Sequence, residues 1–352
     1  MTLPIAVPWL TTQDNQDPRA ATGQPLRWGV VSTGNIAKSV SQDLALLEDA
    51  ELYAVSSRTQ AAADAFANAS GFAKGYGDDA GVPGYQRLFE DPAVDVVYVA
   101  TPHPLHREQA LAAIAAGKHV LIEKPIAMTA AEAREILDAG RAAGVLVAEA
   151  MWTRYLPQAD VIRQLLEAGT LGEIDLVRAD FGSLVPFDPA SRMFAPALGG
   201  GAMLDLGVYI VAFASSIIGP PTTIRAVGTL APTGVDDSAT IALKTDAGAQ
   251  AALTTTFGAV TPIEASVFGS RGRLDVLSPF YGPTGLRLSV DGQVEEWRDD
   301  TLPQVHDGLG YQATAVASFV GAGLVESPLH PHDEVVSVLA TIDEVRRQIA
   351  AG

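Results

Sequence analysis

The sequence predicts an α/β domain with a doubly wound parallel sheet, followed by an α+β domain with a large, mainly antiparallel open sheet. Two observations predict this order. Up to about Ala150, short apolar segments alternate with alanine-rich helical segments; beyond it, strand-like segments alternate polar and apolar residues. Alternating strands and helices indicate parallel strands buried on both faces, whereas polar–apolar alternation indicates an antiparallel sheet with one buried face. The predicted divisions are a loose arm over 1–25, a first domain over 26–150 and a second over 151–352.

The elements of the first domain follow from apolar runs and helix-end signals. The predicted strands are Arg27–Ser32, Leu52–Ser56, Val94–Ala100, His119–Glu123 and Leu146–Ala150. The predicted helices are Thr59–Ala69, Arg107–Ala116 and Ala130–Ala143, with one more after the first strand. A capping-box pattern, Thr129 to Glu132, fixes the start of the last helix.

The second domain is predicted from shorter alternating segments. Its predicted strands are Ile174–Phe181, Thr223–Leu230, Ser238–Lys244, Gln250–Phe257, Glu264–Gly269, Arg273–Leu277 and Leu286–Val290. Its predicted helices are Gln158–Ala168, Ala202–Ile218 and Glu334–Ala350. Asp246-Ala-Gly248 and Asp291-Gly292 are typical of hairpin turns.

Charge and composition exclude several classes of function. The net charge is −18 and the pI is about 4.6, which opposes binding to nucleic acid or to anionic membranes. The chain has no cysteine, so disulfides and thiolate sites are absent. Its six histidines are scattered and no metal site is expected. No secretory signal is recognisable and no apolar run suggests a membrane span, so a cytoplasmic protein is expected.

A phosphate-binding loop is predicted after the first strand. The segment Ser32-Thr33-Gly34-Asn35-Ile36-Ala37 resembles a dinucleotide-binding turn in which Ser32 replaces the usual first glycine. Gly34 permits close approach to a pyrophosphate, and the following helix directs its N-terminus at it. An ordinary strand–turn–helix is the alternative interpretation. The favoured one is a Rossmann domain.

The end of the second strand indicates which dinucleotide is bound. An NAD site usually carries Asp or Glu here, but the sequence reads Ser56-Ser57-Arg58. Arg58 offers a guanidinium, and Ser57 a hydroxyl, to a 2′-phosphate. NADP is therefore the expected cofactor, with NAD less favoured; the alternative is a solvated arginine at a helix start.

Candidate active-site residues follow the next two strands, because ligands bind at the carboxyl ends of parallel strands. Thr101, Pro102, His103 and His106 are expected near the cofactor, although either histidine also suits an ordinary helix start. Glu123-Lys124-Pro125 follows the fourth predicted strand, and its lysine is expected to point into the crevice and hydrogen-bond a substrate oxygen.

Two polar residues on an apolar helix complete the predicted catalytic set. Asp205 and Tyr209 are four residues apart and are expected on one helix face. Tyr209 is interpreted as a general acid/base whose pKa the Lys124 cation lowers toward the operating pH. A core tyrosine with a satisfied hydroxyl is the alternative.

These motifs together resemble the glucose-fructose oxidoreductase / inositol dehydrogenase family, from about Leu26 to the C-terminus. Glu123-Lys124-Pro125 is the most specific of them. Within the family, four segments are similar to the branch of dimeric dihydrodiol dehydrogenases and NADP-dependent D-xylose 1-dehydrogenases. They are Arg27–Ser32, Glu149–Pro157, Gly199–Tyr209 and Gly234–Asp237.

The resemblance implies catalysis by Lys124 and Tyr209 with Asp205 beside them, and a homodimer or homotetramer formed through the open face of the second sheet. Trp152, Arg154 and Tyr155 are expected at the substrate, with packing between the domains as the alternative for the first two. The predicted cofactor-binding residues are Ser32, Thr33, Gly34, Asn35, Ile36, Ser57, Arg58, Thr101, Pro102, His103, His106, Glu123 and Lys124.

The expected activity is NADP-dependent hydride transfer from a CH–OH group of a sugar, of the aldose 1-dehydrogenase type with D-xylose as an example. Two alternatives of the same class remain: a trans-dihydrodiol dehydrogenase, and a reductase of keto-sugars or other carbonyl compounds. A non-catalytic NADP-binding sensor is the alternative of another class.

Overall fold

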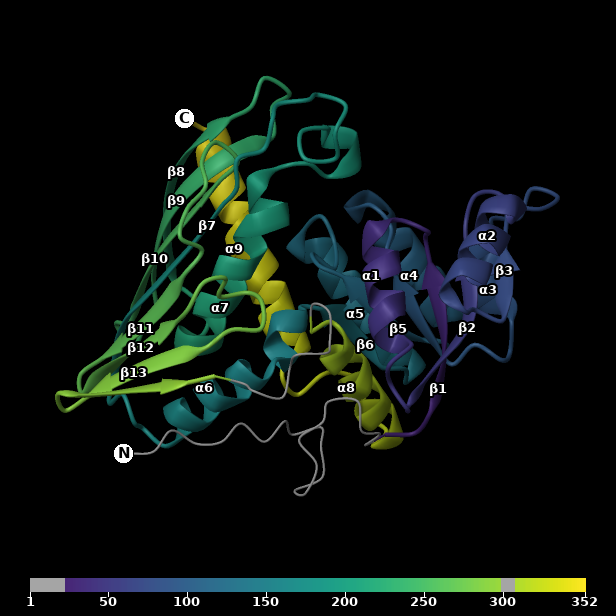
Figure 1. Cartoon of the computed structure of the whole chain (residues 1–352). Helices are drawn as coiled ribbons and strands as arrows, with labels where there is room; N and C mark the ends of the chain where they lie inside the picture. The colour runs from purple at the N-terminus through teal and green to yellow at the C-terminus, as the bar shows by residue number, and fades with distance from the viewer. Residues whose placement is uncertain (1–22, 299–307) are drawn as a thin grey trace.

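The computed structural model describes residues 23–298 and 308–352, so that the predicted N-terminal arm lies almost entirely outside the described residues. Two sheets dominate the molecule and lie at its opposite sides, with helices between them (Figure 1). The predicted fold class is confirmed: a six-stranded parallel sheet is followed by an eight-stranded, mainly antiparallel one.

The first sheet has the strand order β3-β2-β1-β4-β5-β6, and every pair is parallel. This order is that of a Rossmann fold, in which the chain reverses direction across the sheet between β1 and β4. The strands are β1 (Leu26–Val31), β2 (Ala50–Ser56), β3 (Lys74–Tyr76), β4 (Val96–Val99), β5 (His119–Glu123) and β6 (Val147–Ala150). The helices are α1 (Asn35–Leu44), α2 (Gln60–Ser70), α3 (Gly84–Glu90), α4 (His106–Ala115) and α5 (Ala130–Ala143).

Burial explains why the central strands read as continuous apolar runs. All four residues of β4 are buried, as are four of the five residues of β5, because helices cover both faces of the sheet. Thr129 caps α5 as predicted by accepting from Glu132 N, but the Glu132 carboxylate accepts from Met128 N instead of closing the box.

The second sheet has the order β14-β13-β12-β11-β7-β10-β9-β8, and only the β7–β10 pair is parallel. Its strands are β7 (Ile174–Gly182), β8 (Thr223–Leu230), β9 (Asp236–Lys244), β10 (Gln250–Thr256), β11 (Ala265–Gly269), β12 (Gly272–Val276), β13 (Leu286–Val290) and β14 (Gln293–Trp297). Burial alternates along β10, which leaves one face of this part of the sheet exposed. Both predicted hairpins form, and Asp291 and Gly292 have the positive φ angles that a type I′ turn requires.

The inner face of the second sheet is covered by helices that also face the first domain (Figure 1). They are α6 (Pro157–Glu167), α7 (Val208–Ile218) and α9 (His332–Ala350). The stretch Pro196–Ile218 has the length and mean hydropathy, 1.8, of a membrane span, contrary to the expectation from the sequence. However, 78% of its most apolar window is buried inside the protein, as in the core helix of a globular domain.

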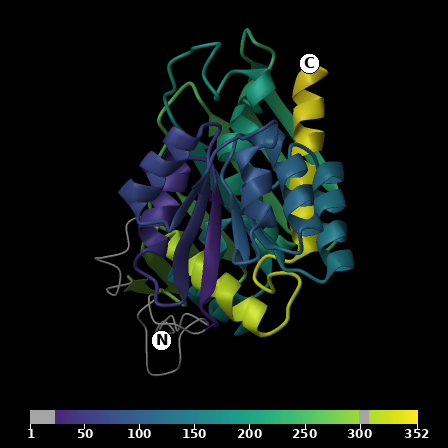
Figure 2. The same ribbon diagram turned by 90° about the vertical axis from the view of Figure 1, so that its right-hand side faces the viewer.

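Four elements escaped prediction: β3, α3, β14 and α8 (Gly310–Gly321). Helix α8 has buried residues on nearly all sides, so it lacks the polar face whose period reveals a surface helix. Although it follows the second sheet in sequence, α8 packs beside α1 and β2 of the first (Figure 2). Gly310 N at its start donates to the Asp43 carboxylate at 2.9 Å.

Candidate active site

Two adjoining cavities lie where the strand order reverses, at the carboxyl ends of the parallel strands. Their volumes are about 770 and 590 Å³, and they share Ser32, Gly34, Thr101, Pro102 and Leu198 as lining residues. Of the residues predicted for the site, the larger cavity is also lined by Thr33, Ser57 and Arg58, and the smaller by Asn35, Ile36, His103, Glu123, Lys124, Trp152, Asp205 and Tyr209. The fold thus joins a nucleotide-sized space to the predicted catalytic residues.

The loop after β1 has the geometry of a phosphate-binding turn. Ser32 has a φ of 114°, a conformation that favours glycine, and its Oγ accepts from Gly34 N at 3.1 Å. Gly34 precedes α1, whose first turn carries neither an acidic side chain nor a side-chain cap. The first N–H groups of α1 therefore remain available for an anion, and the helix dipole favours one there.

Ser57 and Arg58 follow β2 at the far end of the larger cavity. The Ser57 and Thr33 hydroxyls are 3.4 Å apart, which connects the two loops. Arg58 is exposed, and within 23–298 and 308–352 no carboxylate forms an ion pair with it. Its guanidinium is thus available to an anionic ligand. Asp78 also lines the cavity and could replace the acid that is missing from the end of β2. However, its carboxylate already accepts a hydrogen bond from Gly84 N at 2.7 Å.

The Lys124 ammonium is directed at the start of the helix that carries Asp205 and Tyr209. Its Nζ donates to the Asp205 carbonyl oxygen at 2.8 Å and lies 3.6 Å from the Asp205 carboxylate. It also lies 4.6 Å from the centroid of the Tyr209 ring. The fold thereby brings Lys124 into direct contact with Asp205 and Tyr209, which lie 81 and 85 positions further along the sequence, as the predicted catalytic set requires.

The Tyr209 hydroxyl is oriented by Trp152. Trp152 Nε1 donates to the Tyr209 hydroxyl at 3.1 Å, and both side chains line the smaller cavity. Beneath them, Tyr281 stacks on Phe181 at a centroid distance of 4.6 Å and lies 5.4 Å from the Tyr209 ring. These aromatic contacts fix the plane of the Tyr209 ring while leaving 9% of the residue exposed to the cavity.

A π-helical turn, Met203–Gly207, carries Asp205 into the site before α7 begins; the sequence had predicted a single continuous helix. Such turns are frequent at functional sites. The turn is held by Asp236 from the start of β9, whose carboxylate accepts from Met203 N at 2.6 Å. Arg346 of α9 lies 3.5 Å from the same carboxylate.

Burial and neighbouring charges set the protonation states. Burial raises the pKa of Tyr209 above its ordinary value, although the Lys124 ammonium acts in the opposite direction. The expectation of a lowered pKa for Tyr209 is therefore wrong for the protein without cofactor, because desolvation outweighs the cation. Burial acts to lower the pKa of Lys124, but Tyr209 and Asp205 raise it overall, so Lys124 is a cation at neutral pH.

Glu123 supports the segment on which Lys124 lies, in addition to lining the cavity. Its carboxylate accepts from the Tyr98 hydroxyl and, at 3.1 Å, from Lys124 N. Burial raises its pKa, and the Tyr98 hydrogen bond opposes this shift. Tyr98 is fully buried in β4 and gave no signal in the sequence beyond that of a core residue.

The two histidines after β4 have different environments. His103 lines the smaller cavity, and its Nδ1 lies 3.3 Å from the Gly199 carbonyl. Burial, aided by His106, lowers the pKa of His103 to about 3, so it is neutral. His106 lies outside both cavities: its ring nitrogens are 2.8 and 2.9 Å from the carbonyls of Thr101 and Pro125. Its predicted contact with the cofactor is therefore corrected to a role in fixing the two loops.

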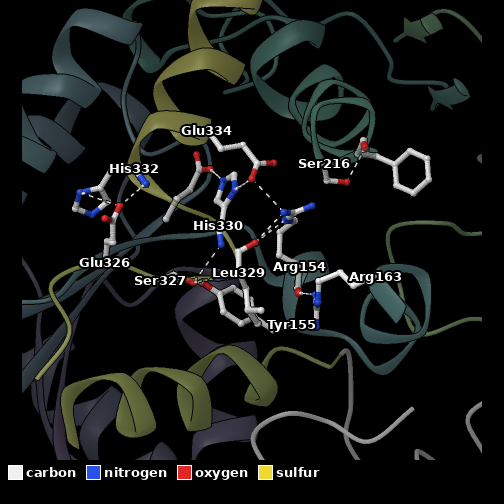
Figure 3. A network of polar contacts seen from close by, with 12 residues as sticks. Arg154, Tyr155, Arg163, Ser216, Glu326, Ser327, Leu329, His330, His332 and Glu334 are labelled. Carbon is white, nitrogen blue, oxygen red and sulfur yellow. Dashed lines mark hydrogen bonds and ion pairs between the residues drawn. The ribbon is translucent and has the colours of Figure 1, made fainter. Parts of the chain in front are cut away.

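Arg154 and Tyr155 are also placed away from the two cavities. Arg154 donates to the Leu329 carbonyl at 2.8 Å and to Glu334 at 3.1 Å, and Tyr155 donates to Ser327 at 2.9 Å (Figure 3). Their predicted contact with substrate is corrected: both tie the segment after β6 to the C-terminal segment. Arg154 and Tyr155 lie next to Trp152 in the sequence, but their side chains point away from the cavity that Trp152 lines, because the chain forms a 3₁₀ turn at Trp152–Tyr155.

Arg192 is a cavity residue that the sequence analysis missed. Its Nη1 lies 3.1 Å from the Asp205 carboxylate, and its side chain is 60% exposed. Burial acts to raise the pKa of Asp205, but Lys124 and Arg192 lower it overall, so Asp205 is a carboxylate between two cations. Arg192 lies in an irregular segment with no motif around it, which explains why no pattern revealed it. No group of three or more potential metal ligands is found among the described residues.

The parallel sheet, the dinucleotide-sized cavity and the Lys–Asp–Tyr cluster define a two-domain NAD(P)-dependent dehydrogenase. Residues 26–151 match the family described as "Oxidoreductase family, NAD-binding Rossmann fold", and residues 159–275 match the "GFO/IDH/MocA C-terminal domain". The chain belongs to this GFO/IDH/MocA oxidoreductase family, as its motifs had suggested.

Known relatives extend over nearly the whole chain. A trans-1,2-dihydrobenzene-1,2-diol dehydrogenase of Macaca fascicularis is 36% identical over 333 residues, which cover 92% of this chain and 97% of its own. A relative of the same name from Bos taurus is 36% identical over 334 residues, with the same coverage. Among solved structures, a 3-ketoreductase of Actinomadura kijaniata in complex with NADP is 28% identical, with a TM-score of 0.79 over 93% of this chain and 98% of its own. A levoglucosan dehydrogenase, 21% identical with a TM-score of 0.83, shares the fold.

Proposed function

We propose that the protein is an NADP-dependent oxidoreductase that transfers a hydride from a CH–OH carbon of a sugar, with aldose C1 oxidation, as of D-xylose, as the favoured reaction. One observation carries this proposal: Lys124, Asp205 and Tyr209 converge on a cavity continuous with the phosphate-binding turn. A hydroxylated substrate at this position would meet both a cation and a phenol.

The residues around the larger cavity fit NADP. The uncapped N-terminus of α1 suits the pyrophosphate, and Arg58, which has no acidic partner among the described residues, suits a 2′-phosphate. An acid at the end of β2, typical of NAD sites, is replaced by Ser57. The 3-ketoreductase relative was crystallised with NADP, which agrees with this assignment, whereas the levoglucosan dehydrogenase was crystallised with NADH. The larger cavity adds the volume that the adenosine half needs.

The proposed roles follow from the contacts of each side chain. A bound NADP would supply the hydride acceptor, C4 of its nicotinamide. Tyr209, with its hydroxyl oriented by Trp152, takes the proton of the substrate hydroxyl. Lys124 hydrogen-bonds the substrate oxygen and favours the phenolate, and Asp205 orients Lys124 and the substrate. In the reverse direction Tyr209 donates the proton back.

A trans-dihydrodiol is the second candidate substrate, because the curated relatives at 36% identity are named for this activity. The aromatic wall formed by Trp152 and Tyr209 suits either a diol ring or the apolar face of a sugar. Reduction of keto-sugars, as in the name of the 3-ketoreductase, uses the same groups in reverse. A non-catalytic sensor needs neither Lys124 nor Tyr209 at the cavity.

A spectrophotometric screen tests the proposal. NADPH formation at 340 nm, a general property of the reduced cofactor, is followed with D-xylose, D-glucose and a trans-dihydrodiol, first with NADP and then with NAD. We expect turnover of an aldose with NADP. Turnover of the diol alone would select the second candidate, and NADP binding without turnover of any compound would favour the sensor.

We further propose a homodimer or homotetramer in the cytoplasm, assembled through the exposed face of the second sheet. That face presents Val227, Thr229, Thr240 and Thr254 along three neighbouring strands, and Val227 is 71% exposed. Small and β-branched side chains of this kind allow two sheets to pack face to face. Light scattering of the purified protein gives the mass, and substitution of Val227 by Lys is expected to lower it to that of a single chain.

A further inference from the structure

A buried chain of alternating charges lies outside the two cavities of the candidate site. It runs from Glu149 in β6 to His330, and on through Glu334 to Arg154. Figure 3 shows the last three of these residues. The Glu149 and His330 side chains are at most 1% exposed. The cluster joins β6, the segment before α9, α9 itself and the 3₁₀ turn after β6. None of its members lines the cavities of the candidate site.

Glu149 connects this cluster to the active-site segment. One carboxylate oxygen accepts from His330 Nε2 at 2.8 Å, and the other accepts from Ile126 N at 2.8 Å. Ile126 is fully buried and lies two residues after Lys124. The Glu149 carboxylate is therefore the acceptor that holds the backbone just beyond the lysine.

The remaining contacts make His330 a fixed partner for Glu149. Burial acts to lower the pKa of His330, but the hydrogen bond to Glu149 and the nearby Glu334 carboxylate, 3.8 Å from Nδ1, raise it overall. Arg154 in turn holds Glu334 at 3.1 Å, and the Ser327 hydroxyl accepts from His330 N at 3.3 Å. A buried carboxylate is costly unless a charge partner and hydrogen bonds accompany it, and Glu149 has both.

We propose that Glu149 is a positioning residue for Lys124: held in place by His330, its carboxylate fixes Ile126 N and thereby the segment that directs the Lys124 ammonium at Asp205 and Tyr209. Lys124 itself is held on its other side by Glu123, which accepts from Lys124 N. The segment Lys124–Ile126 is thus held by two carboxylates, and it is Glu149 that lies outside the cavity. This inference rests on the proposed catalytic role of Lys124.

A pair of variants separates positioning from general packing. In Glu149→Gln, the amide oxygen still accepts from Ile126 N, and the amide nitrogen donates to a neutral His330. In Glu149→Leu, a side chain of similar size leaves Ile126 N without an acceptor. We expect kcat of Glu149→Gln to stay within about threefold of that of the original protein and kcat of Glu149→Leu to fall by about 10- to 100-fold, the scale of a misplaced reacting group. The KM for NADP is expected to remain unchanged in both.

The position of Lys124 is measured independently of activity by its rate of acetylation with acetic anhydride, followed by mass spectrometry of the peptide. Lys124 is expected to react slowly in the original protein and in Glu149→Gln, since its side chain is 12% exposed and hydrogen-bonded. It should react several-fold faster in Glu149→Leu. His332→Leu is the control, because it removes a buried contact with the Val147 carbonyl and leaves Ile126 untouched. That variant should lose stability with kcat and labelling unchanged.

If Glu149→Leu does not fold, Glu149→Asp takes its place, since it keeps a negative charge in the cluster but draws the carboxylate back from Ile126 N, and from His330, by one methylene. Wild-type labelling of Lys124 in the folded Leu or Asp variant would overturn the proposal, as would equal labelling in the Gln and Leu variants. Faster labelling without a fall in kcat would instead support the positioning role and refute the catalytic role of Lys124.

Discussion

Trp152 and Tyr209 are joined by a hydrogen bond of 3.1 Å between the indole nitrogen and the phenol oxygen, while the Lys124 ammonium lies over the tyrosine ring. The two neighbours affect different properties of Tyr209. Trp152 fixes the direction of the hydroxyl, and Lys124 supplies the positive charge that favours its ionised form. This arrangement leads directly to predictions for the phenol itself.

Replacing the phenol by a phenyl ring should remove proton transfer and keep the packing. We expect Tyr209→Phe to lower kcat by about 100-fold or more, the usual contribution of a general acid or base. The dissociation constant for NADP should not change, because the substitution leaves the phosphate-binding turn and Arg58 unaltered. Steady-state kinetics and fluorescence titration measure the two quantities. Tyr281→Phe, which removes a hydroxyl from the same aromatic cluster, is the control and should retain kcat.

The dependence of oxidation on pH should follow the ionisation of Tyr209. Burial raises its pKa above the ordinary 10.0, and oxidation requires the deprotonated form to accept a proton. The pH dependence of kcat/KM reports the pKa values of the free enzyme, so kcat/KM should rise continuously between pH 7 and about pH 10. Lys124→Met should move this rise to still higher pH, because the cation favours the phenolate. A plateau already reached near pH 7 would contradict the assignment of Tyr209 as the base.

Removing the guanidinium at the end of β2 should change the choice of cofactor. A hydrogen bond to a charged group contributes about 1.5–3 kcal/mol, so Arg58→Ala should raise the KM for NADP by about 10- to 100-fold. The KM for NAD should change little, since NAD has no phosphate at this position. Arg107→Ala, which removes an exposed arginine paired with Glu135, is the matched control. An unaltered NADP/NAD ratio in Arg58→Ala would exclude Arg58 as the phosphate ligand.

The positive φ of Ser32 predicts an ordering of two variants. Both Ser32→Ala and Ser32→Gly lose the hydroxyl that accepts from Gly34 N, but only glycine adopts a φ of 114° without strain. Strain of this kind costs about 1–3 kcal/mol, so the free energy of unfolding of Ser32→Gly should exceed that of Ser32→Ala by a similar amount. Denaturant titration without cofactor measures the difference. Equal stabilities would mean that the turn relaxes when the side chain is shortened.

Much of the fold and of the site was predictable because it depends on local pattern. Short apolar runs defined the central parallel strands, and His119–Glu123 and Ala130–Ala143 were predicted to the residue. The carboxyl ends of parallel strands meet at one edge of a sheet, so Ser32, Thr101 and Lys124 could be assigned to one site from their positions alone. Of the elements that escaped, the buried helix α8 has no polar face to reveal its period, and β3, α3 and β14 have only three, seven and five residues.

The sequence by itself determined which segments become strands and helices and which residues follow each strand, since both depend on neighbours along the chain. Only the tertiary structure decided which of these side chains face the cavity. Arg154 donates hydrogen bonds to Leu329 and Glu334 and not to the cavity, and His106 contacts two backbone carbonyls. Arg192, by contrast, reaches the site from an irregular segment. The physical reason is that a buried polar side chain is directed by the partners that satisfy it, and these partners are remote in sequence.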